Sequence, residues 1–168
     1  MENYSEELEE MLGAKTVINK LELIFNDSPF SQFPDEAPLS KLRNINHFIF
    51  KEWERWNVVA KGSMLDSTDC LTLSVVANLL AHRKGLETRV VRPTQLTRYF
   101  HAMLEYDSLN EKETFVVAGR DRHYEYVPLS VDQIEQRLKY SRIIINLVNY
   151  LRFGDNVPLP QPQHLNES

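Results

Sequence analysis

Apolar residues recur along the first third of the chain with the three- and four-residue spacing of helices that bury one face. Residues 5–25 follow this spacing, and Gly13 is placed to divide them into two helices. Residues 39–56 predict a further helix, and the intervening segment 26–38 predicts a loop because it is rich in proline and turn-forming residues. The predicted apolar stripes contain Leu8, Met11, Leu12, Val17, Ile18, Leu21 and Ile24 in the first stretch, and Leu42, Ile45, Phe48, Ile49 and Trp53 in the second.

A connector over residues 57–69 leads into a helical pattern that carries the only cysteine of the chain. The stretch "STDCLTLSVVANLLAHRKG" opens with three residues that favour helix amino termini. Basic residues and then Gly85 suit the end of a helix near Lys84. Cys70 is therefore predicted to lie in the first turn. The expected core-facing positions are Leu71, Val75, Leu79 and Leu80, supplemented by Val76 and Ala77.

From residue 86 the pattern changes to the alternation and valine content of β-strands. A polar stretch, "SLNEKE", separates two of the predicted strands and predicts an antiparallel hairpin. Ser130 is placed to cap a final helix over residues 131–153. The predicted strands are "LETRVVRP" (86–93), "RYFHAMLEYD" (98–107), "TFVVAG" (114–119) and "HYEYVPL" (123–129).

This order of elements predicts the α+β class: N-terminal helices, including the cysteine-bearing one, pack on a small antiparallel sheet that is followed by a C-terminal helix. A chain of 168 residues fits one domain, which we place over residues 1–155. The proline-containing segment 156–168 is expected to be a flexible tail. The apolar stripe from Ile143 to Leu151 is expected to pack, either inside the domain or against a second copy in a homodimer.

Charge and composition narrow the expected partners and location. A net charge of −5 offers no basic excess to neutralise phosphates, so we expect no nucleic acid partner. No apolar run approaches the roughly 18 residues that span a bilayer, and the acidic N-terminus does not resemble a signal peptide. One cysteine cannot form an internal disulfide, so nothing indicates an oxidising compartment. From these three observations together we expect a soluble, cytoplasmic protein. A local basic set is interpreted as an exposed rim: Arg83, Lys84, Arg89, Arg92 and Arg98.

The first-turn position of Cys70 suggests chemistry, because a helix amino terminus and a nearby imidazolium both favour a thiolate. Among the five histidines, His82 lies about 18 Å along the same helix, too far to pair with the sulfur. His101 lies in a predicted strand that could bring it to Cys70, and Asp121 could orient its imidazole. Alternation puts Tyr99, His101 and Met103 on one face of that strand, and Phe100, Ala102 and Leu104 on the other.

These residues resemble the core of the transglutaminase-like (papain-like) cysteine enzymes. "DCLTLSVVANLLAHRKGLETRVV" resembles the cysteine helix and following strand of that superfamily, and "HAMLEY" resembles its "HAW-E" strand. The resemblance covers residues 63–128 and implies a transglutaminase-like domain. It further implies that Cys70 is the nucleophile, His101 the general base and acid, and Asp121 the orienting carboxylate.

The sequence departs from the family pattern at three positions. Asp69 stands where a small residue is common, Met103 replaces a tryptophan, and Asp121 lies in a basic "GRDRH" turn. Two other carboxylates, Glu125 and Asp107, therefore stay open as alternatives for the orienting role. A metal site built from Cys70, His101, Asp121 and His123 is the less favoured interpretation, because no close ligand pair such as CxxC or HExxH is present. We expect no metal and no cofactor.

The function implied by the resemblance is cleavage or transfer of an amide bond in a peptide or protein substrate, through a thioester on Cys70. The backbone N–H of Cys70 would help to hold the oxyanion, with Trp56 or Asn57 as the candidate second donor. Water would resolve the thioester in a protease or amidase, and an amine would do so in a transglutaminase. The alternative is an inactive fold of the same kind that serves as a protein-binding module.

Overall fold

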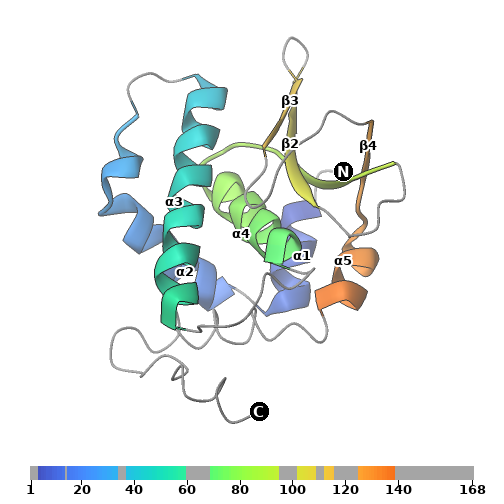
Figure 1. Ribbon diagram of the computed structural model, residues 1–168, viewed down its shortest axis with the longest axis horizontal. Helices are drawn as coiled ribbons and strands as arrows, with labels where there is room; N and C mark the ends of the chain where they lie inside the picture. The colour runs from blue at the N-terminus through green and yellow to red at the C-terminus, as the bar shows by residue number, and fades with distance from the viewer. Residues whose placement is uncertain are drawn as a thin grey trace.

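The computed structural model describes seven ranges of the chain: residues 4–13, 15–33, 37–59, 69–94, 102–108, 112–115 and 125–138. These ranges form helices and an antiparallel sheet, which confirms the α+β class (Figure 1). The helices are α1 (Tyr4–Leu12), α2 (Lys15–Asn26), the short 3-10 helix η1 (Pro29–Ser31), α3 (Pro38–Val59), α4 (Asp69–Arg83) and α5 (Val131–Leu138). The strands are β1 (Arg89–Pro93), β2 (Met103–Asp107), β3 (Lys112–Phe115) and β4 (Tyr126–Pro128).

Glycines end the first and the fourth helix where the sequence predicts. Gly13 has a φ of +58° and separates α1 from α2. Gly85 has a φ of +78°, and its N–H bonds the carbonyl of His82 while the N–H of Leu86 bonds that of Ala81. This pair of bonds is the Schellman ending, which needs a left-handed residue that glycine adopts without strain.

Helix α3 extends further than the sequence predicts. It ends at Val59, so the first three residues of the predicted connector belong to the helix. Its stripe faces the core as expected, although the side chain of Trp53 lies outside the described residues. The buried members are Leu42, Ile45, Phe48 and Ile49.

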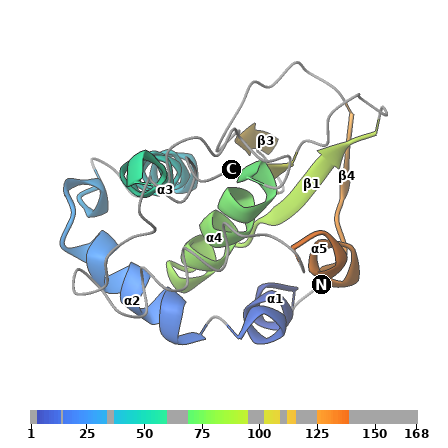
Figure 2. The ribbon, with the colours of Figure 1, turned by 60° about the horizontal axis from the view of Figure 1, so that its bottom comes forward.

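Helix α4 lies at the centre of the described structure. It contacts β1 and β2 on one side and α1, α2 and α3 on the other (Figure 2). Every side chain from Cys70 to Ala81 is buried, so the predicted core-facing stripe understates the burial. A helix buried on all sides is largely apolar around its circumference, and the polar exceptions here are Thr72, Ser74 and Asn78.

The sheet has the order β3-β2-β1-β4, and all neighbouring strands are antiparallel. The predicted hairpin is confirmed as β2–β3, but β3 starts at Lys112 and so includes two residues of the predicted polar turn. Strand β2 starts at Met103, later than predicted. The rest of the predicted second strand (98–101), residues 116–119 of the third and residues 123–124 of the fourth lie outside the described residues.

The two faces of the sheet are both buried near its middle. Val90 lies opposite Leu104, and both belong to the core that contains α4. Val91 lies opposite Met103, and both are fully buried on the other face. The predicted alternation is therefore confirmed within the described part of β2.

Helix α1 is joined to the sheet by a buried hydroxyl. The Tyr4 hydroxyl donates to the carbonyl of Leu129 at 2.9 Å and accepts from the N–H of Val90 at 3.3 Å. Burial raises the pKa of Tyr4 to about 12, because the phenolate would lose its hydration. The first helix is thus fixed to β1 and to the segment that enters α5.

Helix α5 begins with the reciprocal bonds of a capping box. The Ser130 hydroxyl accepts from the N–H of Gln133 at 3.1 Å, and the Ser130 N–H donates to the Gln133 side chain at 2.8 Å. The predicted start of the final helix is confirmed. Residues after Leu138 lie outside the described residues, including the rest of the predicted helix, the stripe from Ile143 to Leu151 and the tail 156–168.

Candidate functional site

The structure describes one of the three predicted catalytic residues. Cys70 is the second residue of α4, as predicted, and is 8% exposed. His101 and Asp121 lie outside the described residues, as does His123 of the alternative metal set. The site must therefore be built from the elements that lead to those positions.

Cys70 belongs to a stripe of α4 that faces the sheet. Cys70, Ser74 and Asn78 are spaced four residues apart, so they lie on the same side of the helix. The Asn78 side-chain amide donates to the backbone and side-chain oxygens of Thr88, each at 2.8 Å, just before β1. The Ser74 hydroxyl donates to the carbonyl of Ala102 at 3.4 Å, just before β2. Cys70 is one turn further along the same stripe.

The contact at Ala102 marks the point where the chain enters β2. Strand carbonyls point within the plane of the sheet towards neighbouring strands. The Ala102 carbonyl also accepts a bond from Ser74 in the helical layer, and the regular strand begins at Met103. The alternation puts Ala102 and Leu104 in the core that contains α4 and Met103 on the other face, and residue 101 lies outside the described residues.

The two alternative carboxylates lie at opposite ends of the sheet. Asp107 ends β2, about 14 Å along the strand from Met103, and it pairs with Arg89 at 3.8 Å. This position excludes Asp107 as the partner of a histidine near the start of β2. Glu125 precedes β4, at the sheet end where β2 begins, because Pro93 pairs with Tyr126 and Val91 pairs with Met103. Glu125 therefore stays open as an alternative to Asp121.

The structure also shows where two other histidines and the proposed oxyanion donors lie in the chain fold. His82 is at the far end of α4 and contacts Glu87 at 3.1 Å, so it does not pair with Cys70. His47 is exposed on α3. Trp56 and Asn57 lie within α3, where backbone N–H groups bond within the helix, and their side chains lie outside the described residues. No group of three potential ligands suited to a metal occurs within the described ranges.

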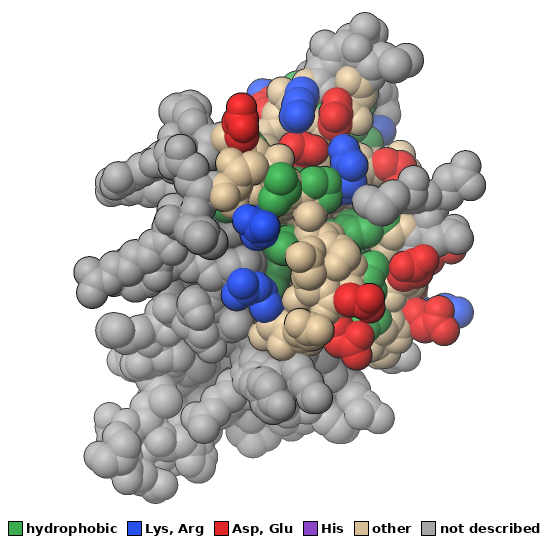
Figure 3. All heavy atoms as spheres, turned by 90° about the vertical axis from the view of Figure 1, so that its right-hand side faces the viewer, with side chains coloured by type: hydrophobic (Ala, Val, Ile, Leu, Met, Phe, Trp, Pro, Cys, Tyr) green, Lys and Arg blue, Asp and Glu red, His purple; other side chains and the backbone are tan. Residues whose placement is uncertain are grey.

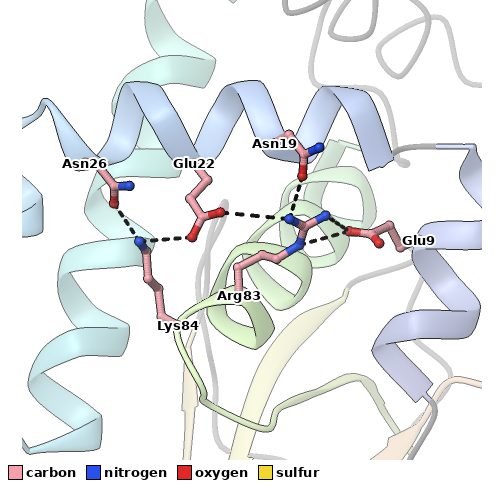
Figure 4. Close-up of polar contacts among 6 residues, drawn as sticks. All are labelled: Glu9, Asn19, Glu22, Asn26, Arg83 and Lys84. Carbon is pink, nitrogen blue, oxygen red and sulfur yellow. Dashed lines mark hydrogen bonds and ion pairs between the residues drawn. The ribbon is translucent and has the colours of Figure 1, made fainter.

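The prediction that the basic set forms an exposed rim is wrong for two of its members. Arg83 bonds Glu9 through Nη2 at 2.7 Å and Asn19 through Nη1 at 2.5 Å (Figure 4). Lys84 bonds Asn26 at 2.5 Å and Glu22 at 3.1 Å. Their side chains are 23% and 19% exposed, because they join the end of α4 to α1 and α2.

The other three members of the predicted rim differ from one another, and Arg92 is half-buried and donates to the carbonyl of Pro93 at 3.0 Å. Arg89 pairs with the buried Glu105 at 3.5 Å, and Arg98 lies outside the described residues. On the face that carries β4 and α5, Figure 3 shows charged side chains of both signs interspersed with small apolar patches. Across the seven described ranges, no helix has the length and apolar character that crossing a membrane requires.

Buried hydroxyls on α4 were not recognised as site features from the sequence. Ser74 and Thr72 are both fully buried, but the Thr72 hydroxyl finds no hydrogen-bond partner within the described ranges, while Ser74 reaches Ala102. Only the four-residue spacing from Cys70 could have indicated Ser74 beforehand. Comparison of the chain with protein-family models, with curated proteins and with solved structures gave no significant match.

Proposed function

We propose that this protein is a transglutaminase-like cysteine enzyme that cleaves or transfers an amide bond of a peptide or protein substrate. Cys70 is the nucleophile, His101 the general base and acid, and Asp121 the orienting carboxylate. The observation that carries the proposal is that three described segments lie together at one end of the sheet: the first half of α4, the start of β2 and the end of β3.

The convergence follows from the described contacts. The Ser74–Ala102 hydrogen bond places the amino-terminal half of α4 at the start of β2, and His101 immediately precedes Ala102 in the chain. Strand β3 is antiparallel to β2, with Phe115 opposite Leu104. The chain therefore leaves β3 towards the end of the sheet where β2 begins, and Asp121 follows Phe115 by only six residues.

The chemistry follows from the position of Cys70. The amino terminus of a helix carries a partial positive charge, which favours both a thiolate and a developing oxyanion. The thiolate forms a C–S bond to the amide carbon, and the C–N bond breaks as His101 gives a proton to the departing amine. Water or a second amine then breaks the C–S bond while His101 takes up a proton, which releases a carboxylic acid or a new amide.

The second candidate function is a protein-binding module without activity. The low exposure of Cys70, 8%, favours this candidate, because a nucleophile must reach a bulky amide substrate. The two functions differ in the state of the thiol. An enzyme needs a reactive thiolate at neutral pH, whereas a binding module has no such requirement.

The deciding experiment is the rate of Cys70 alkylation by iodoacetamide as a function of pH. For the enzyme, we expect an apparent pKa well below the ordinary thiol value of about 8.5, and a rise towards that value in His101→Ala. His82→Ala is the matched control, because His82 lies at the far end of α4, and it should leave the profile unchanged. An unreactive Cys70, or one that titrates normally with and without His101, would contradict the enzyme and support the binding module.

A further inference from the structure

Ser74 is set apart from the other polar residues of α4 by where its hydroxyl goes. Serine within a helix commonly bonds the carbonyl one turn back on the same helix. Ser74 instead donates to Ala102, which is 28 residues away and belongs to the sheet layer. The side chain is fully buried, so this contact lies inside the helix–sheet interface.

The partner of Ser74 lies at the start of β2. Ala102 is fully buried and lies directly before the first residue of β2. Its carbonyl accepts the Ser74 hydroxyl from the helical layer. The bond therefore fixes the junction at which the chain enters β2, one helical turn from Cys70.

We infer that Ser74 is a positioning residue, whose hydroxyl sets the junction before β2 against the first turn of α4 and so aligns the histidine segment with Cys70. This inference rests on the proposed function, since only an active thiol–imidazole pair needs that alignment. Ser74 acts through the carbonyl of Ala102 and takes no part in the bond-making steps. A small hydroxyl suits the role because a larger side chain would separate the helix from the sheet.

A matched pair of variants tests this role. Ser74→Ala removes the hydroxyl that bonds Ala102, and Thr72→Val removes an equally buried hydroxyl of the same helix that bonds nothing in the described structure. The readout is the pH profile of Cys70 alkylation, with melting temperature measured in parallel. We expect Ser74→Ala to raise the apparent pKa of Cys70 by about one unit, which lowers the alkylation rate about tenfold at a pH below both apparent pKa values. Thr72→Val should leave the profile unchanged.

The outcomes separate this inference from the proposed function. If His101→Ala raises the apparent pKa but Ser74→Ala does not, the enzyme stands and the role of Ser74 is overturned. If wild-type Cys70 titrates at the ordinary value, both fail. A Ser74→Ala protein that does not fold, or a Thr72→Val profile that shifts equally, would assign Ser74 to packing and overturn the role.

Discussion

The two ends of α4 are held in different ways. At the carboxyl end, Arg83 and Lys84 bond side chains of both α1 and α2, and Gly85 closes the helix with backbone bonds (Figure 4). At the amino end, the described bond to the start of β2 is the contact between Ser74 and Ala102, at 3.4 Å near the long limit of hydrogen bonding. The helix is thus anchored firmly at the end without proposed chemistry. Catalytic groups need fixed positions, so the amino end should be more sensitive to small changes.

The largest effect is expected when α1 loses its bond to the sheet. Tyr4→Phe leaves the N–H of Val90 and the carbonyl of Leu129 without the Tyr4 hydroxyl, and each buried group then lacks that partner. We expect the free energy of unfolding to fall by about 2 kcal/mol at neutral pH, measured by urea denaturation. Alkylation of Cys70 should change little, because α1 secures the carboxyl end of α4. A stability loss below about 0.5 kcal/mol would contradict the role of this hydroxyl.

The same residue predicts a pH dependence. The pKa of Tyr4 is about 12 in the folded protein and 10.0 for an ordinary tyrosine, so the unfolded chain loses the proton first as pH rises. Its contribution is complete below pH 10 and is lost between about pH 10 and 12, amounting to about 2–3 kcal/mol. The difference in stability between wild type and Tyr4→Phe, which removes the effect of other tyrosines, should therefore shrink over this interval. A stability difference that stays constant from pH 10 to 12 would show that the Tyr4 phenol is not held in its neutral form by burial.

A smaller effect is expected from breaking the carboxyl-end network. Arg83→Ala removes bonds to Glu9 and Asn19 at a mostly buried position. We expect a loss of about 1.5 kcal/mol that becomes smaller at high salt, measured by thermal melts in low and high sodium chloride. The alkylation profile of Cys70 should not change. Arg43→Ala, which removes a more exposed pair with Glu113, is the control and should cost less than about 0.5 kcal/mol.

The smallest effect is a gain in stability. The Thr72 hydroxyl is fully buried and finds no partner among the described residues, so it is desolvated without compensation. Thr72→Val keeps the shape and removes this cost, and we expect stability to rise by about 1 kcal/mol in urea denaturation. A loss of stability would show that the hydroxyl is satisfied in solution, for example by water.

Local signals predicted the parts of the fold that depend on neighbouring residues. Gly13, Gly85 and Ser130 mark helix boundaries because their conformations and caps involve residues within five positions. The first-turn position of Cys70 was predicted for the same reason. The burial of α4 on all sides was not predicted. Its polar residues Asn78 and Ser74 find hydrogen-bond partners 10 and 28 positions away, which the local sequence does not show.

The same limit applies to the charged groups and to the site. Arg83 resembled an exposed residue in the sequence because its partner Glu9 lies 74 positions away. The pairing of Cys70 with a histidine is equally a matter of tertiary structure. The sequence indicates which residues could form such a site. Whether the thiol and the imidazole come into contact depends on the packing of α4 against the sheet at Ala102.

The bond between Tyr4 and Leu129 has a consequence for synthesis. Its two partners are 125 residues apart, so α1 leaves the ribosome long before the segment that it must bind. At translation rates of about 5–20 residues per second, the delay is about 6–25 s. During this interval the apolar face of α1, with Leu8, has no complete core to join. The nascent chain should therefore depend on chaperones until residue 129 emerges, and a ribosome-bound fragment that ends before it should be protease-sensitive at α1.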